Sequence, residues 1–550
     1  MWVSKADSPG RPRTDGTTSS AQAATRPAVS AWRPPTARLH AGLLECTTGQ
    51  QDPEKRQPAE HRRTYILPVA DCTNMSSETT LTRLSATELA ARIRNEDVTA
   101  TEAVEAHLER IEDRDDEVNA FVTVCAEEAR EAAAEADRAL KNGTDVGPLH
   151  GVPVALKDLG DLKAGVRHTF GSALFADHVA ERTAVTVERL EAAGAIVIGK
   201  TNTPAFGHKG TTDNEVAGPT ASPIDTDLNA GGSSGGSAAA LAAGMASLAT
   251  GSDAGGSLRI PAAACGVYGF KPTFGLVPDD GRPNAFGRST HTVTKGPMAR
   301  TVEDAALLLS VMAGPDAADP RSVPIDLEPL EAVDRPASDL EIAYSLDLGA
   351  FSVDDEVRAV VDDAVDAFEA AGATVDEVTV DHGYEMAELR EAVMPTFTTA
   401  MVETATVLKE SQGVDLREHP DDVSDSLLAM LEAGEAYDST DLAKTAIVRT
   451  DVFDAVQDVL ESYDVLVAPT LSSVGVGLHE DPGVEAWDRA LTWPFNWTGH
   501  PVASAPAGLT DRGHPVGLQL VGSRFDDETV LAASAAFERQ RPWHRLYTEG

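Results

Sequence analysis

Two turns rich in glycine and serine hold the residues of this chain best suited to chemistry. GGSSGGS begins at Gly231, SDAGGS ends at Ser257, and a segment of small apolar residues separates them. Clustered glycines permit positive φ angles and close backbone approach, so such turns present main-chain N–H groups. The two turns place two serines, Ser233 and Ser257, 24 positions apart.

Two ordinary interpretations of these turns are excluded by the residues around them. A flexible Gly/Ser linker does not fit, because the block continues into the apolar run SLRIPAAACGVYGFKPT. A phosphate-binding loop does not fit either, because neither turn is followed by the required Lys-Ser/Thr pair. We therefore interpret residues 231–275 as a rigid scaffold that holds the two serines.

A lone lysine ends an apolar segment upstream of this scaffold. GVPVALK, residues 151–157, is short, β-branched and apolar, which predicts a buried strand that ends at Lys157. Burying an ammonium group is costly unless it is neutral or well hydrogen-bonded.

Together these segments resemble one known family, the amidase signature hydrolases. The resemblance lies in GGSSGGS (231–237), GSDAGGSLRIPA (251–262), GFKPTFG (269–275) and GVPVALKDLGD (151–161). At lower stringency it extends from about residue 84 to about residue 540. It implies an α/β fold, in which a large mixed β-sheet is covered by α-helices on both faces, and hydrolysis without a cofactor.

The resemblance also implies a role for each chemical group. Acyl transfer needs a nucleophile, a base and donors for the oxyanion. Ser257 matches the acyl-forming nucleophile, Ser233 the serine that relays a proton, and Lys157 the base. The oxyanion hole matches four backbone N–H groups, those of Ala254, Gly255, Gly256 and Ser257. Lys157 must be neutral to accept a proton, and burial would lower its pKa in that direction.

Other polar residues near the turns have simpler interpretations. We expect Ser234, Ser237 and Ser252 to hydrogen-bond the loops. Asp253 and Arg259 flank the nucleophile and are expected to form a structural ion pair.

Histidine and cysteine residues suggest further candidates that we weigh against structural roles. His208 and His500 invite a catalytic-triad interpretation, but His500 lies in NWTGHPVAS, which we expect to serve packing. Cys265 sits in an apolar run and is expected in the core. The 14 histidines are scattered without an HExxH motif, so no metal site is predicted.

The surrounding pattern alternates helices and strands. Ser85 and Glu88 predict a capping box at the start of a first helix, and a second helix is predicted over about residues 125–141. Helix–strand units at 184–202 and 340–380 and strands at 463–470 and 514–522 indicate an α/β architecture. Residues 383–450 are helical and amphipathic, and we expect them to form a variable lid over the substrate pocket.

The chain is strongly acidic, with a formal net charge of −43 from 88 acidic and 45 basic residues. This charge is spread along the chain, and it disfavours binding to nucleic acid or to anionic membranes. Such a surface repels itself at low salt. We therefore expect a halophilic source, with an ordinary acidic enzyme as the alternative.

Location is predicted from three further features. No apolar run reaches the ~18–20 residues of a membrane-spanning helix, and residues 238–249, the best candidate, are interpreted as a buried helix. No signal-peptide pattern follows Met1. No metal spacing or disulfide framework is formed by the cysteines, which are Cys46, Cys72, Cys125 and Cys265. We expect a reduced, cytoplasmic protein.

Residues 1–74 differ from the rest of the chain. They carry 10 basic and 7 acidic residues, which leaves −46 for residues 75–550. We expect a mis-assigned start with the true protein beginning at Met75; a disordered tail and a regulatory or targeting arm are the alternatives. Residues 75–550 are predicted to form a single amidase domain.

The leading hypothesis is an amidase that hydrolyses a linear, small-molecule carboxamide to a carboxylate and ammonia. The first alternative is the glutaminase subunit of a tRNA-dependent amidotransferase, and the second is a non-catalytic scaffold. By resemblance, the acyl pocket is lined by residues 204–212 and by the variable helices. The sequence leaves open which amide is the substrate and whether the chain forms a homodimer.

Overall fold

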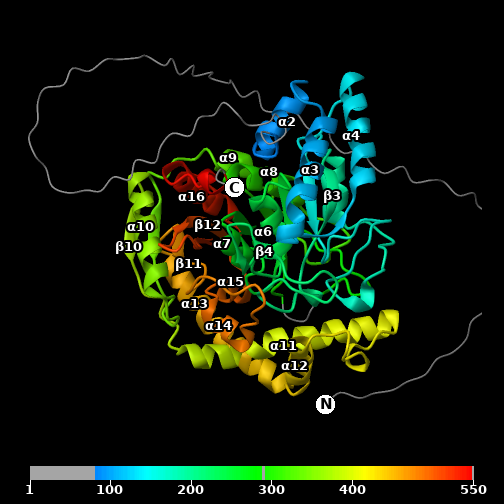
Figure 1. Ribbon diagram of the computed structural model, residues 1–550. Helices are drawn as coiled ribbons and strands as arrows, with labels where there is room; N and C mark the ends of the chain where they lie inside the picture. The colour runs from blue at the N-terminus through cyan, green and yellow to red at the C-terminus, as the bar shows by residue number, and fades with distance from the viewer. Residues whose placement is uncertain (1–80, 288–290, 548–550) are drawn as a thin grey trace, which may run out of the picture. The chain divides into compact units, whose positions relative to one another are not determined.

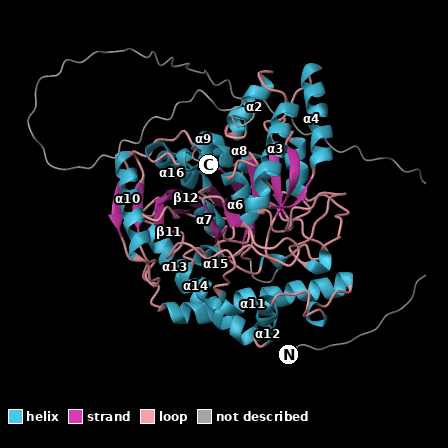
Figure 2. Cartoon of the chain, in the orientation of Figure 1, coloured by secondary structure: helices cyan, strands magenta, loops and turns pink. Residues whose placement is uncertain are grey.

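An eleven-stranded mixed sheet organises this protein, whose computed structural model describes residues 81–287 and 291–547 (Figure 2). The expectations for residues 1–74 lie outside these ranges. The strands are, in spatial order, β1 (Phe121–Val124), β3 (Ile196–Thr201), β2 (Pro153–Lys157), β6 (Leu248–Asp253), β8 (Thr294–Ala299), β7 (Tyr268–Lys271), β12 (Val502–Leu509), β13 (Pro515–Gly522), β11 (Val465–Pro469), β9 (Glu341–Tyr344) and β10 (Thr374–Glu377). In the centre of the sheet, from β6 across to β11 in this spatial order, all neighbouring strands are antiparallel. Parallel pairs flank this centre: β3–β2 and β2–β6 on one side, β11–β9 and β9–β10 on the other.

Helices cover both faces of the sheet because its strands alternate between two apolar cores (Figure 1). In β11, Val465 and Val467 enter one core, while Leu466 and Ala468 enter the other. The first face is covered by α5 (Val185–Ala192), α8 (Val302–Met312), α9 (Pro329–Ala332), α10 (Asp355–Ala370) and α16 (Asp527–Gln540). The second is covered by α3 (Ala100–Val118), α4 (Ala126–Lys141), α6 (Gly235–Ala242), α7 (Arg259–Cys265), α11 (Met386–Gln412), α13 (Ser439–Leu460) and α15 (Trp493–Thr498). The predicted α/β fold is confirmed.

Most predicted elements occur where the periodicity placed them. The helix expected over residues 125–141 is α4, whose N-cap is Cys125 and C-cap Asn142. The unit at 184–202 is α5 followed by β3, and the unit at 340–380 is β9, α10 and β10.

Two local predictions are wrong in detail. Ser85 caps α2 (Ala86–Arg94) by accepting from the Glu88 N–H, but the Glu88 carboxylate pairs with Arg92 instead of closing a capping box. The helix expected over residues 238–249 is α6, which begins earlier and ends at Ala242. Gly244 follows with a φ of +73°, a backbone state that ends a helix, and the chain then enters β6.

The segment at 383–450 is helical, as predicted. It forms α11, α12 (Asp425–Glu435) and most of α13, and α11 packs along α12 at the bottom of Figure 1. Within the described ranges, none of the helices combines the length and apolar character needed to cross a membrane.

Candidate active site

Lys157 lies at the end of β2, between the neighbouring strands β3 and β6, and its side chain is fully buried. Its Nζ donates to Ser233 Oγ at 2.8 Å. It also lies 3.1 Å from Ser252 Oγ and 3.4 Å from the Ser252 carbonyl oxygen. Burial lowers the pKa of Lys157 to about 7, against the opposing charges of Asp253 and Asp161. Near neutral pH, a large fraction of Lys157 is therefore an uncharged amine.

Ser233 is held by a turn that only glycine neighbours allow. The Gly232–Ser233 peptide bond is cis, and a Cβ added at Gly232 would come within 2.5 Å of the Thr211 carbonyl oxygen. A Cβ at Gly207 would come within 3.2 Å of Ser233 Oγ. This close backbone packing leaves the Ser233 side chain 2% exposed beside Lys157.

Ser257 lies in the turn between β6 and α7, and that turn is fixed by Asp253. The Asp253 carboxylate accepts from the Gly256 N–H at 2.6 Å and from the Leu258 N–H at 3.2 Å. Gly256 has a φ of +132°, and a Cβ there would overlap Thr492 Oγ1. Ser257 is partly exposed, and its carbonyl oxygen accepts from the Ser234 N–H at 3.2 Å, which joins the two serine turns.

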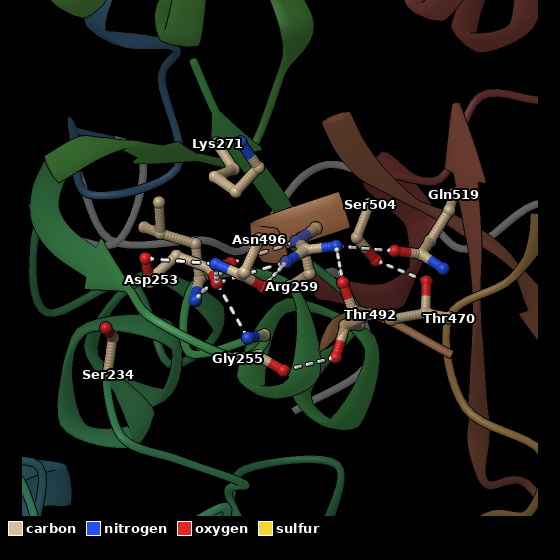
Figure 3. A network of polar contacts seen from close by, with 12 residues as sticks. Ser234, Asp253, Gly255, Arg259, Lys271, Thr470, Thr492, Asn496, Ser504 and Gln519 are labelled. Atoms are coloured by element: carbon tan, nitrogen blue, oxygen red, sulfur yellow. Dashed lines mark hydrogen bonds and ion pairs between the residues drawn. The ribbon is translucent and has the colours of Figure 1, made fainter. Parts of the chain in front are cut away.

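Asp253 and Arg259 form the ion pair expected from the sequence, as Figure 3 shows. Arg259 Nε lies 2.9 Å from Asp253 Oδ2, and both side chains are fully buried. Arg259 also donates to the Thr492 carbonyl oxygen, Asn496 Oδ1 and Gln519 Oε1 at 2.7–2.8 Å. Burial would raise the pKa of Asp253, but Arg259 and Asn496 outweigh it and lower that pKa to about 2. The pair therefore anchors the turn that carries Ser257.

The four backbone N–H groups predicted for the oxyanion hole do not share one environment. The Gly256 N–H is engaged by Asp253 Oδ1, whereas within residues 81–287 and 291–547 the other three, at Ala254, Gly255 and Ser257, have no acceptor. The Gly255 carbonyl oxygen accepts from Thr492 Oγ1 at 2.6 Å, which fixes the orientation of the turn.

The remaining serines of the turns bond the loops, and one of them also contacts Lys157. Ser237 Oγ donates to the Thr250 carbonyl oxygen at 2.8 Å, and Ser234 Oγ donates to the Ser252 carbonyl oxygen at 3.3 Å. Ser252 bonds Ser234 of the neighbouring turn, as expected, through its backbone N–H and carbonyl oxygen, and its Oγ also accepts from Lys157 Nζ. Sequence reasoning missed this contact because nothing in the local pattern separates Ser252 from its neighbours.

The two histidines considered for catalysis are both hydrogen-bonded to groups other than the two serines. His500 is buried between Thr498 Oγ1 and Gln457 Oε1, at 2.7 Å from each. His208 bonds the Ala205 carbonyl oxygen at 2.8 Å and Ser426 Oγ of α12 at 2.9 Å. Burial lowers the pKa of His208 to about 4 and that of His500 to about 3, so both are neutral. Cys265 is fully buried in the core, as expected.

A cavity of about 280 Å³ opens onto the turn that carries Ser257. Ala254, Gly255 and Ser257 form one wall, and residues 207–210 form another, within the segment expected to line the acyl pocket. The facing wall comes from α11, α12 and the segment 481–490, which includes α14 (Ala486–Arg489). Two of the helices expected to form a lid thus contribute to the cavity that contains Ser257.

Comparison with known proteins identifies the family of this chain. Residues 102–531 match the Amidase family. The chain belongs to the amidase signature family. It is 38% identical over 478 residues to an acylamidase of Rhodococcus erythropolis, covering 85% of this chain and 97% of that relative. It is also 34% identical over 487 residues to a glutamyl-tRNA(Gln) amidotransferase subunit of Carboxydothermus hydrogenoformans, covering 84% and 98%.

Solved structures lead to the same family. A bacterial aryl acylamidase described as an amidase signature enzyme superposes with a TM-score of 0.80 at 36% identity, covering 84% of this chain and 98% of that chain. A 6-aminohexanoate cyclic dimer hydrolase bound to its substrate superposes with a TM-score of 0.77 at 28% identity, covering 85% and 99%.

Proposed function

We propose that this protein hydrolyses a linear carboxamide to a carboxylate and ammonia through a covalent acyl group on Ser257. The observation that carries the proposal is the 2.8 Å contact between the buried Lys157 Nζ and Ser233 Oγ, beside the turn that holds Ser257. A neutral lysine and a bridging hydroxyl are the parts that a serine nucleophile needs when no histidine serves as its base.

In the proposed reaction, neutral Lys157 takes the Ser233 proton while Ser233 takes the Ser257 proton. Ser257 Oγ forms a bond to the carbonyl carbon, and the negative charge that develops on the carbonyl oxygen is stabilised by the N–H groups of Ala254, Gly255 and Ser257. The tetrahedral intermediate breaks its C–N bond, and the relayed proton leaves with ammonia. Water then attacks the acyl carbon and passes a proton through Ser233 to Lys157. The C–O bond to Ser257 breaks, Ser257 Oγ regains that proton through Ser233, and the carboxylate is released.

The relatives also support a second candidate, the glutaminase subunit of a tRNA-dependent amidotransferase, because glutamyl-tRNA(Gln) amidotransferase subunits match most of the chain. A non-catalytic scaffold is the third. Ammonia release from a panel of amides that includes glutamine, measured in molar salt, separates the three. Turnover of simple amides alone supports the amidase, turnover of glutamine alone supports the amidotransferase role, and no turnover supports the scaffold.

Three substitutions test the assigned roles. Ser257→Ala is expected to abolish turnover and covalent labelling by a fluorophosphonate. Ser233→Ala is expected to be about 10²–10⁴-fold slower yet still label at Ser257, and Lys157→Ala at least as impaired. Ser234→Ala is the matched control, since Ser234 occupies the same turn without contacting Lys157. Labelling at Ser233 in the wild-type protein, or near-normal turnover of Lys157→Ala, would overturn the assignment.

A further inference from the structure

An aromatic pair covers the turn that carries the proposed nucleophile. The rings of Phe397 from α11 and Trp487 from α14 lie with centroids 4.4 Å apart. Both contact the same glycine, because a Cβ added at Gly255 would meet Phe397 Cε1 at 3.3 Å and Trp487 Cη2 at 3.6 Å. The aromatic pair therefore stands next to the position of the reacting carbonyl, two residues from Ser257.

Methionines extend this apolar wall. The chain has only nine methionines, and three of them, Met394, Met401 and Met430, line this one cavity. Methionine is flexible and polarisable, and it contacts aromatic rings favourably. A wall of methionine and aromatic side chains is suited to a flat apolar group and adapts to differences in its substituents.

Charged side chains at the cavity are already paired. Lys209 Nζ lies 2.6 Å from Asp213 Oδ1 and 3.5 Å from Asp481 Oδ2, so this cation is shared by two carboxylates. His208 is neutral and bonded to Ser426. Among the described residues, no cation lining the cavity lacks a carboxylate partner. A substrate carboxylate would thus lose contact with water without gaining a free cation as its partner, which is unfavourable.

We infer that the cavity selects an uncharged acyl group that carries an aromatic ring, and that Phe397 and Trp487 are its specificity-determining residues. The inference rests on the proposed function: when ammonia is the leaving group, the bulk of the substrate belongs to the acyl group, which stays bonded to Ser257 after ammonia leaves. The cavity beside Ser257 must therefore hold that group in both half-reactions.

The test compares 3-phenylpropanamide with butanamide, two alkyl amides of similar reactivity that differ mainly in the terminal ring. We expect the wild-type protein to favour the phenyl amide in kcat/KM by at least about 10-fold. Phe397→Ala and Trp487→Ala should each reduce kcat/KM for the phenyl amide by roughly 10- to 200-fold. Their values for butanamide should change much less. Glutamine, which is charged, should be a poor substrate for all of them.

Two measures keep this result interpretable. Rates are normalised to the fraction of Ser257 that a fluorophosphonate labels, so misfolded protein is not counted. Phe286→Ala is the matched control, because Phe286 is 70% exposed and lies outside the cavity lining. An unchanged substrate ratio in both cavity variants, or wild-type preference for butanamide, would overturn the inference while leaving the proposed function intact. Turnover of glutamine alone would overturn the inference and support the amidotransferase role instead. Hydrolysis of no amide by the wild-type protein would refute the proposed function and the inference together.

Discussion

The sharpest prediction concerns the pH dependence of turnover, because Lys157 must be neutral to act as the proposed base. Its buried amine has a pKa of about 7, lowered from 10.5. About one tenth of the molecules would then carry neutral Lys157 at pH 6 and about nine tenths at pH 8. We therefore expect kcat/KM to rise about tenfold between these two pH values and then level. The reason is that the neutral amine of Lys157 becomes protonated, and can no longer accept a proton, as the pH falls through about 7.

A second buried lysine provides the control for this experiment. Burial also lowers the pKa of Lys271 to about 7, but its Nζ donates to the Pro272 carbonyl oxygen and contacts neither serine. In Lys271→Met, kcat/KM should therefore still rise with pH near pH 7, and the loss of the Lys271 charge should shift the midpoint of that rise only a little. The rate at which a fluorophosphonate labels Ser257, measured by quenching samples at successive times, should show the same dependence on pH as kcat/KM in both proteins. A flat profile between pH 6 and 8, or a rise that disappears only in Lys271→Met, would refute the reasoning.

Four further expectations can be checked directly. Because residues 75–550 carry −46, structure and activity should be lost below roughly 0.5 M salt, and full activity after dialysis into dilute buffer would contradict the halophilic interpretation. A chain beginning at Met75 should match the full chain in Tm and turnover, whereas a marked drop in either would show that residues 1–74 contribute to the fold. Arg259→Met leaves the buried Asp253 carboxylate without its cation and should lower the free energy of unfolding by about 3–5 kcal/mol in a denaturant titration; a loss below about 1 kcal/mol would mean that the pair does not anchor the turn. Gly255→Ala places a methyl group 3.3 Å from Phe397 Cε1, so it should lower kcat/KM for the phenyl amide more than for butanamide. Equal losses for the two amides would contradict this expectation.

Local sequence patterns determined the elements and the residue types of the site. The apolar run before Lys157 predicted a buried strand, and Lys157 does end β2. The glycines around Ser233 and Ser257 predicted tight turns, and Gly231 and Gly256 do adopt positive φ angles of +74° and +132°. These predictions hold because strand burial, helix periodicity and turn sterics depend on neighbours only a few residues away.

Only the tertiary structure decided which of these groups meet. Lys157 and Ser233 are 76 positions apart, and they come within 2.8 Å because β2 lies beside β6 and α6, which begins just after Ser233, packs against both. The same packing brings Ser252 to Lys157, 95 positions away in the chain. It also places Phe397 and Trp487, 90 positions apart, against Gly255. Such contacts depend on strand order and on the paths of distant helices, and residue periodicity carries no information about either.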